Sequence, residues 1–237
     1  MQKEFFSINQ IPAVLWGKRT EKLIIAVHGN HSNKTDLPIE YLAQSATSKG
    51  YQILSFDLPQ HGERKNKIPP CKVPFCVEDL TTVMQYAKKN WNEISLFANS
   101  IGAYFSLLAY QHENLKQAWF LSPLVDMQHM IENMMLWFHI TPEQLKQKQE
   151  ISTPIGETLD WTYYCFVKEH PICYWKTPTY ILCGGQDTVC EPDTVSTFAK
   201  RFSCQLKLVP EAEHYFHTPE QLDIFSSWLE DTLSVDF

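Results

Sequence analysis

The chain has 237 residues, which suits one α/β domain with a substantial core and leaves little room for a second. Hydrophobic residues make up 44% and charged residues 20% of the sequence, an ordinary globular composition that excludes extensive disorder. The net charge is −7 and the sequence has no basic run, so a nucleic-acid partner is disfavoured because nothing would neutralise its phosphates.

The lack of a recognisable targeting signal and the arrangement of the cysteines indicate the expected compartment. Residues 1–6 lack the apolar segment of a secretion signal, and no later run reaches membrane-spanning length, so we expect a cytoplasmic protein without a membrane span. The seven cysteines are odd in number and scattered, which favours reduced thiols. Cys71 and Cys76 flank four loop residues, but no matching Cys or His pair follows, so a metal site is not expected there.

Strands and helices are expected to alternate from the N-terminus onward. The expected strands are residues 5–8 and 13–16, which would form an antiparallel hairpin, then 22–28, 51–57, 94–96, 117–121, 179–183 and 205–209. The expected helices are residues 38–49, 77–91 after a proline-rich loop over 64–74, 100–109, 192–201 and 219–233. This pattern predicts a mostly parallel central sheet with helices on both faces, whose functional loops gather at the carboxyl ends of the strands.

The alternation stops between about residues 124 and 177. Met127, Met130, Met134 and Trp137 recur there at helical spacing, and a polar helix over 142–150 and a second aromatic group follow. The stripe either seals against the sheet or belongs to a small helical cap whose apolar side contacts a substrate. We therefore expect one domain over residues 1–237 with a cap insertion at about 124–177.

The sequence Phe97-Ala98-Asn99-Ser100-Ile101-Gly102 joins a buried strand to a helix through a sharp corner. A serine at such a corner is strained, its hydroxyl stands clear of both elements, and only small residues fit two places before and after it. Ala98 and Gly102 meet that requirement. The N-terminus of the following helix directs N–H groups at the space where an oxyanion would develop.

This corner resembles the nucleophile elbow G-x-S-x-G of the α/β-hydrolases, with Ala98 in place of the first glycine. Asp187 and His214 each follow a later strand, so the order Ser100, Asp187, His214 is that of the α/β-hydrolase family. The resemblance covers nearly the whole chain outside the insertion. It implies the α/β-hydrolase fold and a catalytic triad in which Ser100 attacks, His214 is the base and Asp187 orients it.

Four further segments are similar to the family's motifs. His28-Gly29 closes a central strand, which implies that the N–H groups of Asn30 and Ile101 form the oxyanion hole. Residues 57–62 look like the turn D-x-x-G-H-G, with Gln60 in place of a glycine. Residues 184–187 resemble the G-x-x-D that presents the acid, and residues 213–216 resemble the loop that presents the histidine.

Alternatives remain at this point. His28 and His61 are expected to hydrogen-bond neighbouring loops rather than to catalyse. His217 could replace His214 as the base, and Asp126 could replace Asp187 as the acid, because it too follows a strand end.

The expected function is hydrolysis of a carboxylic ester of a small or medium apolar substrate through an acyl-enzyme, because the corner is uncharged and methionines offer an adaptable apolar surface. No metal or organic cofactor is needed for that reaction. A thioesterase or a serine peptidase of the same fold remains an alternative, and so does a binding protein that has lost turnover. An aminopeptidase would need acidic residues in the insertion to hold a free amine; Glu132, Glu143, Glu150, Glu157 and Asp160 are present there, but they are unremarkable on solvated helix faces.

Overall fold

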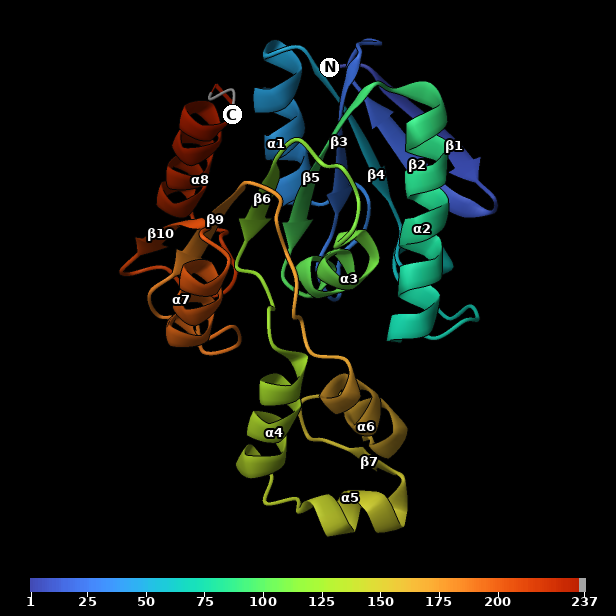
Figure 1. Cartoon of the computed structure of the whole chain (residues 1–237), viewed down its shortest axis with the longest axis vertical. Helices are drawn as coiled ribbons and strands as arrows, with labels where there is room; N and C mark the ends of the chain where they lie inside the picture. Colours follow the sequence, from blue (N-terminus) through green and yellow to red (C-terminus); the bar gives the residue numbers. More distant parts are fainter. Residues whose placement is uncertain (235–237) are drawn as a thin grey trace. The chain divides into compact units, whose positions relative to one another are not determined.

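The computed structural model of the chain describes residues 1–234 (Figure 1). It divides into two compact units. The larger unit comprises Met1–Leu124 and the chain from Tyr174 onward, and the smaller unit is Val125–Cys173. Within residues 1–234, no helix is both long and apolar enough to cross a membrane.

The larger unit contains an eight-stranded sheet in the order β1-β2-β4-β3-β5-β6-β9-β10. The strands are β1 (Lys3–Ile8), β2 (Ile11–Trp16), β3 (Lys22–Val27), β4 (Tyr51–Phe56), β5 (Glu93–Asn99), β6 (Ala118–Leu121), β9 (Thr179–Gly184) and β10 (Gln205–Val209). β2 is antiparallel to both of its neighbours, and every other pair is parallel. The carboxyl ends of the parallel strands therefore share one edge, where the sequence predicts the functional loops.

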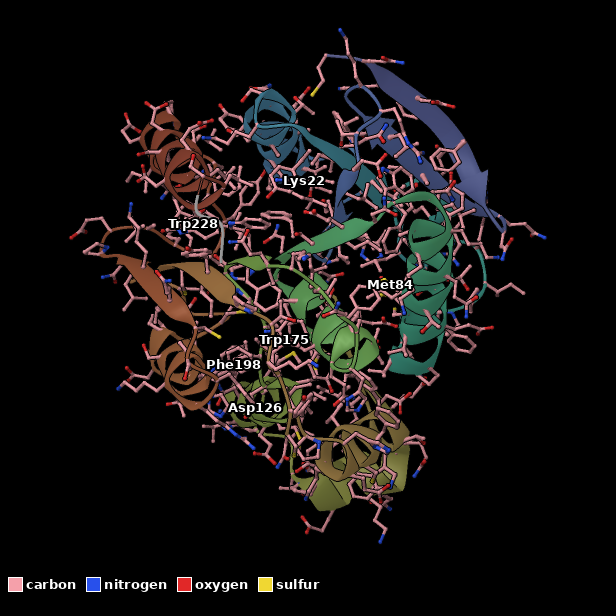
Figure 2. All side chains as sticks on the ribbon, turned by 45° about the horizontal axis from the view of Figure 1, so that its top comes forward. Lys22, Met84, Asp126, Trp175, Phe198 and Trp228 are labelled. Carbon is pink, nitrogen blue, oxygen red and sulfur yellow. The ribbon has the colours of Figure 1, made fainter. Side chains whose placement is uncertain are left out.

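Helices cover both faces of this sheet. They are α1 (Leu37–Ser48), α2 (Val73–Asn90), α3 (Ile101–Tyr110), α7 (Pro192–Arg201) and α8 (Pro219–Thr232), and η1 (Gly62–Arg64) is a single 3-10 turn. α1 packs against α8 and α2 against α3 (Figure 1). Figure 2 labels one residue from each of these two pairs, Trp228 on α8 and Met84 on α2.

Alternate residues of the central strands fill two hydrophobic layers. Ile24, Phe97 and Trp119 belong to the cluster that also contains the buried residues of α1 and α8. Their strand neighbours Ile25 and Phe120 are also fully buried. Since neighbouring side chains of a strand point to opposite faces, both faces must be covered, which explains why these strands read as continuous apolar runs.

The expected N-terminal hairpin is present, with β1 paired to β2 from Lys3 opposite Trp16 to Ile8 opposite Ile11. Asn9 and Gln10 make the turn with φ angles of 46° and 70°. The expected start of the second helix at residue 77 is wrong, because α2 begins at Val73. Pro74 occupies the first turn of α2, where a missing N–H costs no hydrogen bond, so this proline starts the helix rather than extending the loop.

The smaller unit consists of α4 (Met127–Trp137), α5 (Pro142–Lys148), a hairpin of β7 (Glu150–Ser152) with β8 (Thr158–Asp160), and α6 (Trp161–Glu169). The sequence did not predict the hairpin, and the expected helix over 142–150 is two residues too long. Gln149 ends α5 with a φ of 65°, which breaks the helical path. The turn residues between β7 and β8 include Gly156, whose φ is 87°.

Candidate active site

Ser100 occupies the corner between β5 and α3. Its φ of 51° and ψ of −122° are strained for a residue with a Cβ, as the sequence predicts for a nucleophile elbow. Gly102 is required in the first turn of α3, because a Cβ there would lie 2.5 Å from the carbonyl oxygen of His28. The small residues around Ser100 therefore let α3 begin directly against the end of β3.

Ser100, His214 and Asp187 are joined by two hydrogen bonds. Ser100 Oγ lies 3.0 Å from His214 Nε2, and His214 Nδ1 lies 2.8 Å from Asp187 Oδ2. A carboxylate can only accept, so Nδ1 carries the imidazole proton and Nε2 is left to accept the serine hydroxyl. The sequence placed these three residues after different strands, and the fold brings their side chains into one chain of hydrogen bonds.

Asp187 is held by contacts that the sequence analysis did not identify. Its side chain is buried, and its Oδ1 accepts the N–H groups of Val189 at 2.8 Å and Cys190 at 2.7 Å. An aspartate followed by a tight turn is the sequence signal for such bonds, and Asp187-Thr188-Val189 fits it. Oδ2 is thereby left facing His214.

Cys190 is a buried thiol beside this carboxylate. Burial and the charge of Asp187 raise the pKa of Cys190 well above its ordinary value, so the group stays protonated. Within residues 1–234, Asp187, Cys190 and His214 are the one group of three potential metal ligands, with donor atoms within 4.8 Å of one another. Both oxygens of Asp187 already have protein partners, and the geometry is that of a hydrogen-bonded acid and base.

The loop that carries His214 lies against the end of β9. A Cβ at Gly184 would lie 2.3 Å from the carbonyl oxygen of Ala212, so only glycine permits this approach. The N–H of Gln186 donates to the same carbonyl at 2.9 Å. The two glycines of residues 184–185 thus bring the acid-bearing and histidine-bearing loops together, which is the physical reason for that motif.

Asn30 and Ile101 lie next to Ser100 along two different segments. Ile101 is the first residue of α3, where N–H groups have no intrahelical acceptor. Asn30 follows Gly29, whose backbone packs beside Ser100 so closely that an added Cβ would lie 3.3 Å from the serine Cβ. Both residues are chain neighbours of groups beside Ser100, and the oxyanion hole formed by their N–H groups stays a prediction.

His28 and His61 connect loops, as expected. His28 Nδ1 donates to the Gly29 carbonyl at 2.7 Å, and its Nε2 accepts the N–H of Leu58 at 3.0 Å. Complete burial lowers the pKa of His28 to about 4, so the ring is neutral. His61 Nδ1 bonds to the Pro59 carbonyl, and its Nε2 accepts the N–H of His31 at 3.1 Å.

A buried ion pair fixes the loop after β3. Lys34 Nζ lies 2.7 Å from Asp57 Oδ2 and 2.7 Å from Glu63 Oε1, and Asp57 Oδ1 accepts the N–H of Lys34 at 2.9 Å.

Gln60, which stands where the family motif has a glycine, has a φ of 61°. This left-handed conformation is the one that glycine adopts without strain, which accounts for the motif's usual residue.

The alternative base and acid have other partners. The ring of His217 is exposed, donates through Nδ1 to the Tyr215 carbonyl, and stacks on the Tyr215 ring. Asp126, labelled in Figure 2, is exposed and caps α4 by accepting the N–H of His129 at 2.9 Å. The histidine that contacts Ser100 is His214, and the carboxylate that contacts His214 is Asp187.

The methionine stripe of the smaller unit is not uniformly buried. Met127 is buried and Met130 and Met134 are half-buried, whereas Trp137 is 47% exposed. The buried residues of α4 are Met127, Ile131 and Met135, which follow a spacing of four residues. Trp137 is therefore not part of the buried side of α4.

No protein-family model and no curated protein matches the sequence, but solved structures match the fold. Est1E from Butyrivibrio proteoclasticus, solved with ferulic acid bound, superposes with a TM-score of 0.82 at 20% identity and covers 97% of both chains. Mouse alpha/beta hydrolase domain-containing protein 10 gives 0.78 at 15% identity and covers 98% of both. The Pyrococcus furiosus esterase Pf2001 gives 0.70 at 16% identity, covering 98% of this chain and 89% of that one. The chain therefore has the α/β-hydrolase fold.

Proposed function

We propose that this chain is a serine hydrolase that cleaves carboxylic esters of small or medium apolar substrates through an acyl-enzyme. The observation that carries the proposal is the pair of hydrogen bonds from Ser100 through His214 to the buried Asp187. A serine hydroxyl is a weak nucleophile by itself, and a base within hydrogen-bond reach that is oriented by a third group supplies the activation it needs.

In the proposed reaction, Ser100 Oγ attacks the acyl carbonyl while His214 Nε2 takes its proton. The Asp187 carboxylate holds the proton on Nδ1 and stabilises the imidazolium that forms. The N–H groups of Asn30 and Ile101 donate to the oxyanion, and His214 returns its proton to the leaving alkoxide. A water molecule, activated by the same histidine, then releases the acid from Ser100.

The ester preference has weaker support than the reaction type. One of the structurally similar proteins, Pf2001 from Pyrococcus furiosus, is named an esterase, and another, Est1E, was solved with ferulic acid bound. Met127, Met130, Met134 and Trp137 stay a predicted contact surface for the acyl group. Met130, Met134 and Trp137 are half-buried or exposed and therefore available to a ligand, whereas Met127 is buried. A thioesterase or a peptidase would use the same three residues.

Labelling with a fluorophosphonate probe tests the proposed nucleophile, because such probes react with activated serines. We expect the wild type to be labelled on Ser100, and Ser100→Ala to be unlabelled. His214→Ala should lose labelling, whereas His217→Ala is the matched control and should keep it. Absence of labelling in the folded wild type would favour the binding protein without turnover.

A substrate panel then separates the reaction classes. Acyl esters, acyl thioesters and aminoacyl amides that share one acyl group should be compared by kcat/KM. The proposal predicts the highest value for the esters. A higher value for thioesters or amides would keep the triad and overturn the ester assignment.

A further inference from the structure

Cys71 and Cys76 form a thiol pair beside the loops that support Ser100. Cys71 lies in the segment between η1 and α2, and Cys76 lies in the first turns of α2. Their sulfur atoms are 3.7 Å apart. A disulfide needs a separation near 2.05 Å, so the two sulfurs have to approach by only about 1.7 Å, within one unit of the fold.

The two thiols differ in the way that a reacting and a resolving cysteine differ. Cys71 is half-buried and is a hydrogen-bond partner of the His61 side chain. Cys76 is buried, and this burial and the neighbouring Cys71 raise its pKa. Cys71 is therefore the thiol that an external oxidant meets first, and Cys76 lies in position to displace the product.

The pair is connected to Asn30, the candidate oxyanion donor, through His61. The N–H of Cys71 donates to Gln60 Oε1 at 3.1 Å, and the Cys71 thiol faces His61. His61 Nε2 in turn accepts the N–H of His31 at 3.1 Å and lies 3.0 Å from Asn30 Oδ1. Drawing Cys71 toward Cys76 removes one partner of the imidazole that holds residues 30–31.

We propose that Cys71 and Cys76 are a redox modification site, in which a hydroperoxide converts the two thiols to a disulfide and thereby lowers the activity of the adjacent site. The loss of activity rests on the proposed function, because it acts through the Asn30 N–H. Formation of the disulfide does not depend on that function.

The chemistry balances with the hydroperoxide as the only added reactant. Cys71 sulfur attacks a peroxide oxygen, the O–O bond breaks, and Cys71 sulfenic acid and one water, or an alcohol from an organic peroxide, are formed. Cys76 sulfur then attacks Cys71 sulfur, the S–O bond breaks, and the oxygen leaves as water with the Cys76 proton. Two thiols lose two electrons in total, and the peroxide gains them.

The experiment treats the whole chain with hydrogen peroxide, blocks remaining thiols with an alkylating agent, and maps peptides by mass. We expect a linked peptide pair containing Cys71 and Cys76, which dithiothreitol separates again. Cys76→Ser should instead accumulate a Cys71 sulfenic acid that dimedone traps. Failure to find the linked pair in the wild type, while dimedone or the alkylating agent shows other cysteines reacting, would overturn the modification site.

Activity measured on the same samples tests the second step. Oxidised wild type should lose kcat, by up to the roughly 100- to 1,000-fold that removal of one oxyanion donor costs, and dithiothreitol should restore it. Cys71→Ser should show no response to peroxide. Cys173→Ser, which removes an exposed thiol, is the matched control and should respond like the wild type.

The outcomes separate the two proposals. A complete disulfide with unchanged kcat would overturn the effect on the site. If the reduced protein neither hydrolyses esters nor reacts with a fluorophosphonate, the proposed function fails, whereas the peptide map still reports on the disulfide by itself.

Discussion

At the scale of single residues, the identity of the acid is the sharpest question. Asp187→Asn keeps the shape of the side chain but can donate to Nδ1, which favours the wrong imidazole tautomer. By analogy with the serine-protease substitution, kcat should fall by about 10⁴-fold. Steady-state hydrolysis of a simple ester measures this.

Asp126→Asn is the matched control for that measurement. Its carboxylate accepts the N–H of His129 at the start of α4, so the change should weaken a helix cap by about 1 kcal/mol or less and leave kcat near that of the wild type. A larger loss from Asp126→Asn than from Asp187→Asn would contradict the assignment.

His28 predicts how stability depends on pH. Its pKa is lowered by burial from 6.5 to about 4 in the folded chain, so between these values the unfolded chain binds the proton and the folded chain does not. The free energy of unfolding should therefore fall as the pH drops from 6.5 to 4, by about 3 kcal/mol from this group. Denaturant unfolding across this range measures the slope.

His28→Gln isolates that contribution, because glutamine offers an acceptor and a donor but does not titrate. The comparison is needed since burial raises the pKa of Asp36 to about 6, and this carboxyl acts in the opposite direction over the same range. The wild type should lose more stability than His28→Gln on acidification. Parallel profiles for the two proteins would show that His28 is not held neutral.

At the scale of elements, the corner between β5 and α3 stores backbone strain. Glycine adopts the φ of 51° at position 100 without a Cβ clash, so Ser100→Gly should be more stable than Ser100→Ala by about 1 kcal/mol. This difference is the backbone strain that glycine relieves, minus the larger conformational entropy that glycine loses on folding. Urea unfolding of the two inactive variants measures the difference.

Position 106, in the middle of α3, gives the opposite order. There glycine should be less stable than alanine by about 1 kcal/mol, because the backbone is helical. If glycine were the less stable residue at position 100 as well, the corner would not be strained.

The elements also show what a sequence alone can predict. The central strands of the sheet can be predicted because they are continuous apolar runs buried on both faces, and the residues after them follow from the shared edge of parallel strands. The start of α2 and the β7–β8 hairpin are not readable in this way. Pro74 suits both a loop and a first helical turn, and three-residue strands carry too few side chains to establish an alternation.

The candidate site likewise contains residues that the sequence predicts and contacts that it does not. Ser100, Asp187 and His214 can be assigned from motif order, whereas the N–H groups of Val189 and Cys190 that hold Asp187 depend on backbone turns. The packing of Gly184 against Ala212 joins the end of β9 to a loop distant along the chain, and the contact of Cys71 with Cys76 joins a loop to the first turns of α2. Local propensity does not encode such contacts.

At the scale of the whole molecule, the insertion raises a prediction about acyl-group length. If the stripe that includes Trp137 contacts the acyl chain, each added methylene should raise kcat/KM by lowering its activation free energy by about 0.8 kcal/mol, until the surface is covered. Trp137→Ala should then shift the optimum toward bulkier acyl groups. Because Trp137 is 47% exposed, the melting temperature should change little.

Leu136→Ala is the matched control for this series. It removes an exposed apolar side chain from the neighbouring position of α4 but lies outside the stripe. The control should leave the chain-length profile unchanged. An unchanged profile in Trp137→Ala as well would remove Trp137 from the acyl-binding surface.

In the proposed mechanism, Ser100 becomes acylated during turnover. The most direct measurement mixes the protein with p-nitrophenyl acetate, quenches it with acid during the first turnovers, and locates any acetyl group by peptide mass mapping. The wild type should carry one acetyl group on Ser100, and Ser100→Ala should show neither adduct nor turnover. Turnover that persists in Ser100→Ala, or an acetyl group carried by another residue during productive turnover, would contradict it.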